Sequence, residues 1–190
     1  MSQAWAGSIA IGAHRPTAYD QAMSDILVRT LARADAPAYR DLRLEALRRN
    51  PEAFSSTLEI ELARPMSWFE ERQGGREMFG AFRGADLVGM AGFVPLQGPK
   101  KAHRAMLVSM YVDPSARGLG VGKRLVDAVI AHAQGRVEAL QVGVVAGNDA
   151  AHRLYLDAGF VEYGADRKAL KQDGRYDDEI LMVLDLAAAW

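Results

Sequence analysis

The sequence predicts a single domain with a mixed α/β fold, and three observations carry that prediction. The chain has 190 residues, of which 49% are hydrophobic and 25% charged, which is typical of one globular domain with a sizeable core. Two short apolar runs in the middle of the chain predict a hairpin, which requires antiparallel strands. Strands then alternate with helices in the second half of the chain, which is typical of parallel neighbours.

The first predicted elements are a strand and a helix. The run Ile-Leu-Val-Arg-Thr-Leu over 26–31 is apolar and rich in β-branched residues, as expected of a strand. Asp35 is predicted to cap the following helix, with Pro37 in its first turn. Asn50 and Pro51 then end it.

A second helix is predicted from a capping pattern. Ser56 and Glu59 have the spacing of a capping box, which places a helix start there. Pro65 is expected to break or kink this helix, and the pair Gly74 and Gly75 to end it.

The remaining elements are predicted from apolar runs and from the glycines that end them. A helix with one apolar face is expected to end at Gly135. We expect the hairpin over 78–82 and 87–94, strands over 106–112, 139–145, 160–163 and 180–186, and a short helix over 149–158.

The two ends of the chain are predicted to differ from the middle. Residues 1–24 are expected to form a flexible N-terminal extension, and residues 25–190 a single domain. The N-terminus lacks the basic start and long apolar stretch of a secretory signal or membrane span. The apolar tail over 186–190 has two interpretations, a frayed end or a contact in a homodimer.

Charge and cysteine content exclude several classes of function. There are 23 Lys and Arg against 24 Asp and Glu, so the net charge of -1 provides no bulk field for nucleic acid. The chain has no cysteine, which rules out disulfides and thiolate chemistry and fits a cytoplasmic protein. A metal site is not expected because the histidines are scattered and none has a ligand spacing. The four are His14, His103, His132 and His152.

The informative segment is the glycine-rich turn between a strand and a helix. Glycines at 118, 120 and 122 allow a tight bend, and the new helix presents unpaired amides, which favour a phosphate. A nucleoside triphosphate loop would need glycine at 117 and Ser or Thr at 124, and both positions hold arginine. A dinucleotide fingerprint would need glycine where Lys123 stands. The same glycines are equally consistent with an ordinary sharp turn between a strand and a helix that binds no ligand.

Two motifs then resemble the GNAT superfamily of N-acetyltransferases. Residues 117–122, Arg-Gly-Leu-Gly-Val-Gly, are similar to the coenzyme A pyrophosphate loop of that superfamily. The second motif of the superfamily comes at its usual separation, with Asn148, Ala151, Leu154, Tyr155, Gly159 and Phe160. The resemblance implies a GNAT-like fold with six or seven mostly antiparallel strands, a central parallel pair and about four helices.

The resemblance also implies where acetyl-CoA, as co-substrate, would bind. Backbone groups of Met110 and Val112 would pair with the pantetheine arm, and the amides from Gly118 to Lys123 would hold the pyrophosphate. The Asn148 side chain would contact the coenzyme arm, and it also suits a helix N-cap. The coenzyme-binding residues implied are Met110, Tyr111, Val112, Arg117, Gly118, Leu119, Gly120, Val121, Gly122, Lys123, Asn148 and Tyr155.

Acetyl transfer to an amine sets the chemical demands on the site. A lysine-like amine with a pKa of about 10.4 is protonated at neutral pH, which adds about 4.6 kcal/mol to the barrier unless a base helps. Tyr155 is expected to donate a hydrogen bond to the leaving thiolate. Many relatives place a glutamate at the position of Ser109, so the candidate bases here are Glu59 and Glu61, each of which is also a plausible structural or solvated residue.

The leading functional prediction is transfer of acetyl from acetyl-CoA to a primary amine of a small molecule or peptide, directly within a ternary complex. The resemblance implies a bulge in the strand that holds Met110, where a backbone amide would face the carbonyl. The alternatives are a coenzyme A sensor that has lost turnover and a protein that binds nucleotide with the glycine turn. Nucleic acid and membranes are not expected partners.

Overall fold

The computed structural model of the chain describes residues 25–75 and 77–187. Within them, seven strands form one sheet in the order β1-β2-β3-β4-β5-β7-β6, and β4 and β5 are its parallel pair. The predicted fold class is confirmed, with five α-helices where about four were expected. The strands are β1 (Ile26–Thr30), β2 (Glu77–Arg83), β3 (Asp86–Pro95), β4 (Arg104–Val112), β5 (Ala139–Val145), β6 (Val161–Gln172) and β7 (Arg175–Asp185). The helices are α2 (Ala36–Arg49), α3 (Leu58–Leu62), α4 (Met66–Gly75), α5 (Val121–Ala133) and α6 (Asp149–Asp157), with 3-10 turns η1 (Arg33–Asp35), η2 (Pro51–Ala53) and η3 (Pro114–Ala116).

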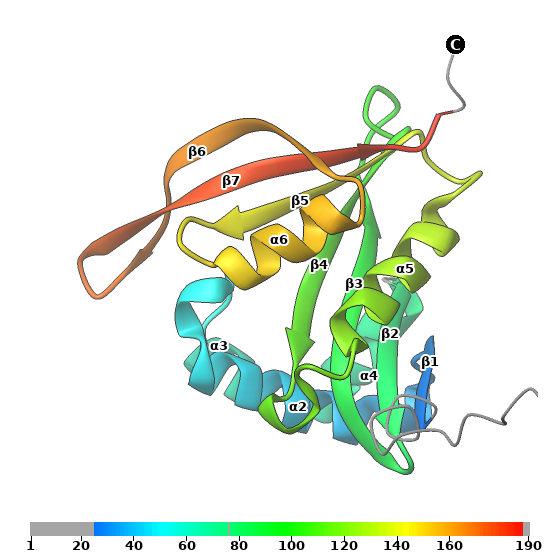
Figure 1. Ribbon diagram of the computed structural model, residues 1–190. Helices are drawn as coiled ribbons and strands as arrows, with labels where there is room; N and C mark the ends of the chain where they lie inside the picture. Colours follow the sequence, from blue (N-terminus) through cyan, green and yellow to red (C-terminus); the bar gives the residue numbers. More distant parts are fainter. Residues whose placement is uncertain (1–24, 76, 188–190) are drawn as a thin grey trace, which may run out of the picture.

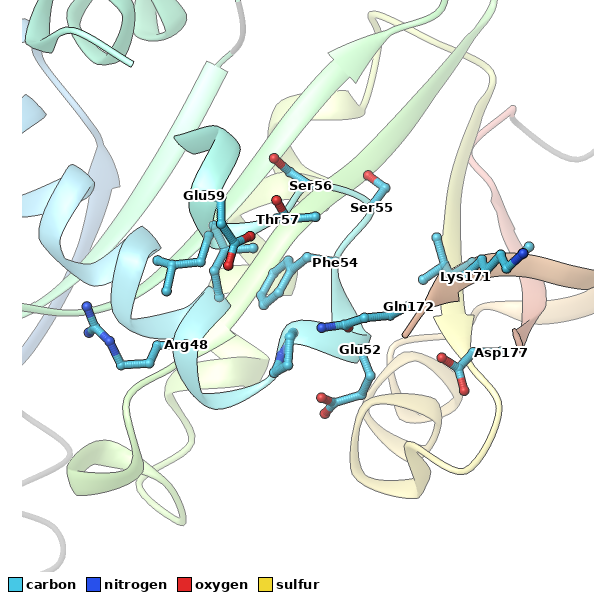
Figure 2. A pocket seen from close by; sticks show the side chains of 15 residues that line it. Arg48, Glu52, Phe54, Ser55, Ser56, Thr57, Glu59, Lys171, Gln172 and Asp177 are labelled. Carbon is cyan, nitrogen blue, oxygen red and sulfur yellow. The ribbon is translucent and has the colours of Figure 1, made fainter. Parts of the chain in front are cut away.

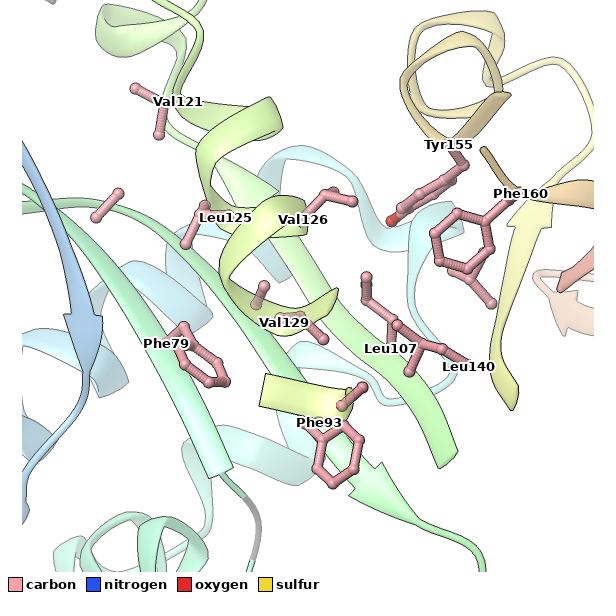
Figure 3. Packing of buried hydrophobic residues seen from close by; sticks show 14 of the residues in the cluster. Phe79, Phe93, Leu107, Val121, Leu125, Val126, Val129, Leu140, Tyr155 and Phe160 are labelled. Atoms are coloured by element: carbon pink, nitrogen blue, oxygen red, sulfur yellow. The ribbon is translucent and has the colours of Figure 1, made fainter. Parts of the chain in front are cut away.

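Helices α5 and α6 cover one face of the sheet (Figure 1). The apolar face of α5 carries Leu125, Val126 and Val129, which are fully buried in one cluster with Leu107 and Leu140 of the strands (Figure 3). Each such side chain contributes about 1.5–3 kcal/mol when it is fully buried. This packing fixes the start of α5, and therefore the glycine turn before it, against the end of β4.

Helices α2 and α4 cover the opposite face. Tyr39 of α2 and Phe69 of α4 are fully buried there, beside Met78 of β2 and Met90 of β3. Met78 belongs to this second core while its neighbour Phe79 belongs to the first, because successive side chains of a strand point to opposite faces. The sheet is therefore buried on both sides around its centre.

The parallel pair opens partway along its length. β4 pairs with β5 from Arg104 to Met106, opposite Ala139 to Gln141, and beyond that point the two strands diverge (Figure 1). The opening leaves backbone groups of β4 without a strand partner on that side, so a ligand can pair with them.

The β6–β7 hairpin is longer than predicted. Its strands span twelve and eleven residues, whereas the sequence predicted only 160–163 and 180–186. Most of β6 is exposed, and its outward residues include Tyr163, which is 50% exposed. A strand that projects past the helices has no apolar alternation, so periodicity could not detect it.

One predicted helix cap is wrong, and another has the predicted residue without the capping bond. Thr57, not Ser56, is the N-cap of α3, and its hydroxyl accepts a hydrogen bond from the amide of Ile60. Asp35 is the N-cap residue of α2, as predicted, but its side chain makes no capping hydrogen bond, because its carboxylate accepts from the amide of Ala32 and pairs with an arginine of β1 instead.

The helix predicted to bend at Pro65 is two helices, α3 and α4, which accounts for the extra helix in the count. Gly75 ends α4 as predicted. The extension predicted over 1–24 lies outside the described residues, as do the last three residues of the apolar tail.

Candidate functional site

The loop after β4 has the backbone form of an anion site. Gly118 and Gly120 have φ angles of 75° and 69°, in the left-handed region that glycine adopts without strain. Gly120 is the N-cap of α5, and the amide of Arg124 donates to its carbonyl at 3.1 Å. The amides of the residues between Gly120 and Arg124 precede this first helical hydrogen bond and are available to a ligand. The positive end of the helix dipole therefore lies where β4 ends.

This loop lines a groove of about 500 Å³ between the ends of β4, α5 and α6. Most of the residues predicted to bind acetyl-CoA line the groove. Leu119 does not, because it packs against the core, and Tyr155 lies in a neighbouring hollow. The predicted residues on the groove are Met110, Tyr111, Val112, Arg117, Gly118, Gly120, Val121, Gly122, Lys123 and Asn148.

The side chains of the two basic loop residues have partners within the protein. The Arg117 Nε donates to the carbonyl of Val112 at 3.2 Å, and the Lys123 Nζ pairs with Asp127 one turn along α5 at 2.6 Å. Both side chains are exposed, so the charges are screened. The loop therefore offers an anion its backbone amides first.

The backbone of β4 faces the opening between β4 and β5. The amide of Asp113 donates to the carbonyl of Val88 on β3, at 2.9 Å. Because the backbone groups of successive residues point to opposite sides of a strand, those of Val112 point away from β3. They face the side from which β5 has diverged, where the resemblance placed the pantetheine arm.

A bulge interrupts β4 at Ser109. Met90 of β3 pairs with Tyr111 and Gly92 pairs with Val108, so Ser109 and Met110 stand opposite a single residue. Ser109 has a φ angle of 56°, which is uncommon for a residue other than glycine. The bulge predicted for this strand is therefore present, and it turns the backbone at the point where β4 and β5 separate.

Tyr155 of α6 lies in a hollow of about 100 Å³ between β4 and β5. Its side chain is only 3% exposed, and its ring makes an edge-on contact with Phe160, with the ring centroids 5.5 Å apart (Figure 3). Burial raises the pKa of Tyr155 above the ordinary value for tyrosine, so the phenol stays protonated and is able to donate a hydrogen bond.

Asn148 joins the groove to the Tyr155 hollow, since it lines both. It is the N-cap of α6, and its side-chain oxygen accepts from the amide of Ala151 at 3.2 Å. The cap predicted from the sequence is confirmed. Because this bond uses the side-chain oxygen, the amide donors of Asn148 are left for a ligand.

Two further hollows share lining residues with the groove and the Tyr155 hollow. One, of about 540 Å³, is lined by residues of α2 to α4, β4, β5 and β7, including Trp68, Ser109 and Gly143. The other, of about 440 Å³, lies between the segment after α2 and the tip of the β6–β7 hairpin (Figure 2). Phe54 lines all four hollows, so it stands at the junction between them.

The structure places the two predicted bases differently. Glu59 is exposed on α3 and lines the hairpin hollow of Figure 2, and hydrogen bonds from its own amide and from Thr57 lower its pKa. Glu61 is 1% exposed and forms a bidentate ion pair with Arg43. The Arg43 Nη2 donates to Oε1 at 2.8 Å, and its Nε donates to Oε2 at 3.0 Å. Both carboxylate oxygens of Glu61 are thus engaged in a buried, charge-assisted pair with Arg43.

Arg43 is a site residue that the sequence did not reveal. It is 3% exposed, lies over the ring of Phe54 with 4.5 Å between the guanidinium carbon and the ring centroid, and lines the 540 Å³ hollow. In the sequence it is one of several arginines on a helix, and nothing there distinguishes it from the solvated ones.

Glu179 of β7 is a second residue that the sequence missed. Its side chain lies over Gly143 of β5, so that a Cβ built on Gly143 would stand 3.1 Å from its Oε2 atom. Within residues 25–75 and 77–187, the Glu179 carboxylate has no hydrogen-bond or ion-pair partner. Burial, together with the nearby charge of Asp166, raises its pKa. In the sequence it ends a polar run just before the strand predicted over 180–186, so no periodicity marked it.

Among residues 25–75 and 77–187, no three His, Asp or Glu side chains gather closely enough to hold a metal ion. In those ranges, no helix combines the length and apolar character needed to cross a bilayer.

Comparison with known proteins agrees with the site. The model of the acetyltransferase (GNAT) family matches residues 38–160. The N-alpha-acetyltransferase RimI of Mycobacterium tuberculosis is 30% identical over 149 residues, which cover 78% of this chain and 87% of that protein. The L-amino acid N-acetyltransferase AaaT of Escherichia coli is 26% identical over 165 residues, which cover 84% of this chain and 98% of that protein.

Solved structures show the same architecture. The ribosomal-protein-alanine N-acetyltransferase from Brucella melitensis has a TM-score of 0.71 and 30% identity, over 84% of this chain and 99% of that chain. The acetyltransferase yncA from Salmonella typhimurium, solved with acetyl-CoA, has a TM-score of 0.72 over 87% of this chain and 96% of that chain, and its 22% identity supports the fold alone.

Proposed function

Since the chain belongs to the GNAT acetyltransferase family and is an acetyl-CoA-dependent N-acetyltransferase, we propose that its acceptor is a primary amine of a small molecule or peptide. The two curated relatives support this class of acceptor, because one is named for an α-amine and the other for L-amino acids. We propose further that the acetyl group passes directly from one substrate to the other.

The observation that carries the proposal is the continuity of the hollows through the opening of the sheet. The groove beside the glycine loop meets the Tyr155 hollow at Asn148 and Met110. The Tyr155 hollow meets the 540 Å³ hollow at Ser109 and Gly143. A thioester that enters from one side and an amine that enters from the other would therefore meet beside the bulge of β4.

Each residue of this path has a proposed task. The amides after Gly120 bind the pyrophosphate, and the outward backbone of Val112 pairs with the pantetheine arm. The backbone turned at Ser109 presents an amide to the thioester carbonyl. The Tyr155 hydroxyl donates to the sulfur as negative charge develops there.

Direct transfer is proposed because the chain offers no convincing acyl carrier. There are no cysteines in the sequence, and no serine stands in a Gly-x-Ser-x-Gly elbow. An amine that attacks the thioester in a ternary complex needs no such carrier. The kinetic signature expected is therefore sequential, without exchange of acetyl groups in the absence of acceptor.

The test is an assay of thiol release from acetyl-CoA with a panel of primary amines, alongside calorimetry of acetyl-CoA binding. Release with at least one amine and binding of acetyl-CoA are the expected results. Binding without release across amino acids, peptides and polyamines would instead support the coenzyme A sensor, an alternative that the comparisons do not favour.

A further inference from the structure

We infer that Glu179 is the general base of the reaction, acting from β7 across the side-chain-free backbone of Gly143 on the amine in the 540 Å³ hollow. The inference rests on the proposed acetylation of a primary amine and adds to it the residue that removes the amine proton. The sequence analysis predicted Glu59 or Glu61 of the early helices as the base. The fold instead brings the carboxylate of Glu179, from the last strand, into the 540 Å³ hollow.

The first argument is position. Glu179 pairs with Val145 of β5 in the strand register, and its side chain leans along the sheet over Gly143. Gly143 lines both the 540 Å³ hollow and the Tyr155 hollow, and Ser109 does the same from β4. Glu179 therefore stands on the acceptor side of the point where the two hollows meet, and Tyr155 stands on the coenzyme side.

The second argument is the contrast between the carboxylates of this region. Glu61 is engaged by Arg43 at 2.8 Å, and Glu59 is exposed and lines the other hollow. Glu179 is half-buried and has no ion-pair or hydrogen-bond partner in the described part of the chain. A carboxylate that is partly withdrawn from water without a partner is unfavourable for folding, and such groups are characteristic of functional sites.

The third argument is the electrostatic setting. Asp166 lies directly opposite Glu179 on β6, and this like charge acts with burial to raise the pKa of Glu179. The Arg43–Glu61 pair across the hollow is neutral as a unit, so it does not cancel that effect. A carboxylate with a raised pKa is a stronger base. The charged groups on the elements around it are Asp166 on β6, Asp177 on β7, Arg43 on α2, Glu61 on α3 and Arg64 after α3.

The proposed step conserves protons and electrons. The acceptor enters as an ammonium ion, and Glu179 takes one proton and leaves the nitrogen lone pair to form the C–N bond. The C–S bond breaks with its electron pair on sulfur, and Tyr155 stabilises the developing thiolate by donating a hydrogen bond to it. The sulfur then takes up the second nitrogen proton. Glu179 releases its proton to solvent, so the products are the acetamide, the free thiol and one proton.

The experiment compares Glu179→Gln with Glu138→Gln. The second variant is a matched change at an exposed residue that directly precedes β5, at the opposite end of that strand from Val145. We expect Glu179→Gln to lower kcat about tenfold to a thousandfold at pH 7 and to leave the Kd of acetyl-CoA within about twofold. We also expect its activity to recover as the pH approaches the pKa of the amine, because the free amine is then supplied by solution. Glu138→Gln should behave as the wild type.

A second variant gives a directional readout. Asp166→Asn removes the like charge, so it should lower the pKa of Glu179 and move the acidic limb of the kcat/KM profile to lower pH. A wild-type kcat and pH profile in Glu179→Gln would overturn this inference and leave the acetyltransferase proposal intact. Absence of thiol release by the wild-type enzyme with every amine would overturn both.

Discussion

At the scale of single residues, the site depends on how each polar side chain is held. Tyr155 is buried against Phe160 and stays protonated, Glu61 is engaged by Arg43, and Glu179 has no partner in the described part of the chain. The three groups are polar, yet burial and partners give them different chemistry. Residue type alone therefore does not assign a role in this site.

Replacement of Tyr155 by phenylalanine tests the proposed donor. We expect turnover to fall roughly tenfold to a thousandfold, because the leaving sulfur loses its hydrogen-bond donor, while the affinity for acetyl-CoA changes little. Thiol release and calorimetry measure the two quantities. Tyr163→Phe is the matched control, since Tyr163 is half-exposed on β6 and its hydroxyl accepts from Gln141 instead. Equal turnover in the Tyr155 variant and the control would reject Tyr155 as the donor.

The Arg43–Glu61 pair makes a separate prediction about stability. Because both side chains are buried, Arg43→Met leaves an uncompensated carboxylate and should cost about 3–5 kcal/mol in the free energy of unfolding. A double variant that combines Arg43→Met with Glu61→Leu should recover most of that loss, because no charge then remains buried. Urea unfolding measures both.

The same pair also tests the catalytic role expected of Glu61. If Glu61→Gln kept its stability and lost the acidic limb of the pH profile, Glu61 would be the base after all. A loss of stability with an unchanged pH profile agrees with a structural ion pair.

At the scale of elements, the functional feature is the start of α5. The helix is fixed by a fully apolar face, and its N-cap glycine has the left-handed φ angle that turns the amides outward. The chain reaches this point directly from β4, whose outer backbone has lost its partner strand. In the proposed function, these two adjacent elements supply the backbone contacts for the diphosphate and for the amide-rich arm of the coenzyme.

Gly120→Val tests this element. The side chain would be forced into a left-handed conformation at a cost of about 1–2 kcal/mol and would crowd the path to the amides. Gly135→Val is the matched control, because Gly135 has a φ angle of 72° just beyond the other end of α5 and its Cβ would meet no atom within 4 Å. Both variants should lose similar stability, and only Gly120→Val should lose binding of acetyl-CoA by calorimetry. Unaltered affinity in Gly120→Val would remove the loop assignment.

The elements also show which parts of the site the sequence can predict. The glycine loop and the Asn148 cap are local features, set by spacing within a dozen residues, and the structure has both. The boundaries of α5 and β5 follow from apolar periodicity for the same reason. Thr57 replaced Ser56 as a cap because neighbouring hydroxyl residues compete for one position, and spacing alone does not choose between them.

The missed residues depend on contacts far apart in the chain. Glu179 and Gly143 are brought together by the pairing of β5 with β7, and Arg43 meets Glu61 through the packing of α2 on α3. Neither pairing leaves a periodic or compositional mark in the sequence. The exposed β6–β7 hairpin carries no alternation either, so the acceptor side of the site was predicted less well than the coenzyme side.

At the scale of the whole molecule, the sheet consists of two halves that are separated by a wedge-shaped opening between β4 and β5. β1 to β4 form one half and β5 to β7 the other, and the strand pairing that joins them spans only Arg104 to Met106. A ligand that pairs with the open edge of β4 would add to this connection. If the coenzyme binds there as we propose, its binding is coupled to the stability of the fold.

This coupling leads to a prediction for thermal unfolding. A ligand that binds only the folded state at one hundred times its Kd stabilises that state by about 2.7 kcal/mol. For a chain of this size, about 2–4 °C per kcal/mol converts that to a rise in Tm of about 5–11 °C. Scanning calorimetry with and without acetyl-CoA measures the shift, with Gly135→Val as a control that should keep it and Gly120→Val as a variant that should not. A wild-type Tm unmoved by saturating acetyl-CoA would show that the wedge does not bind the coenzyme, whereas the same rise in both variants would show that it binds without the loop.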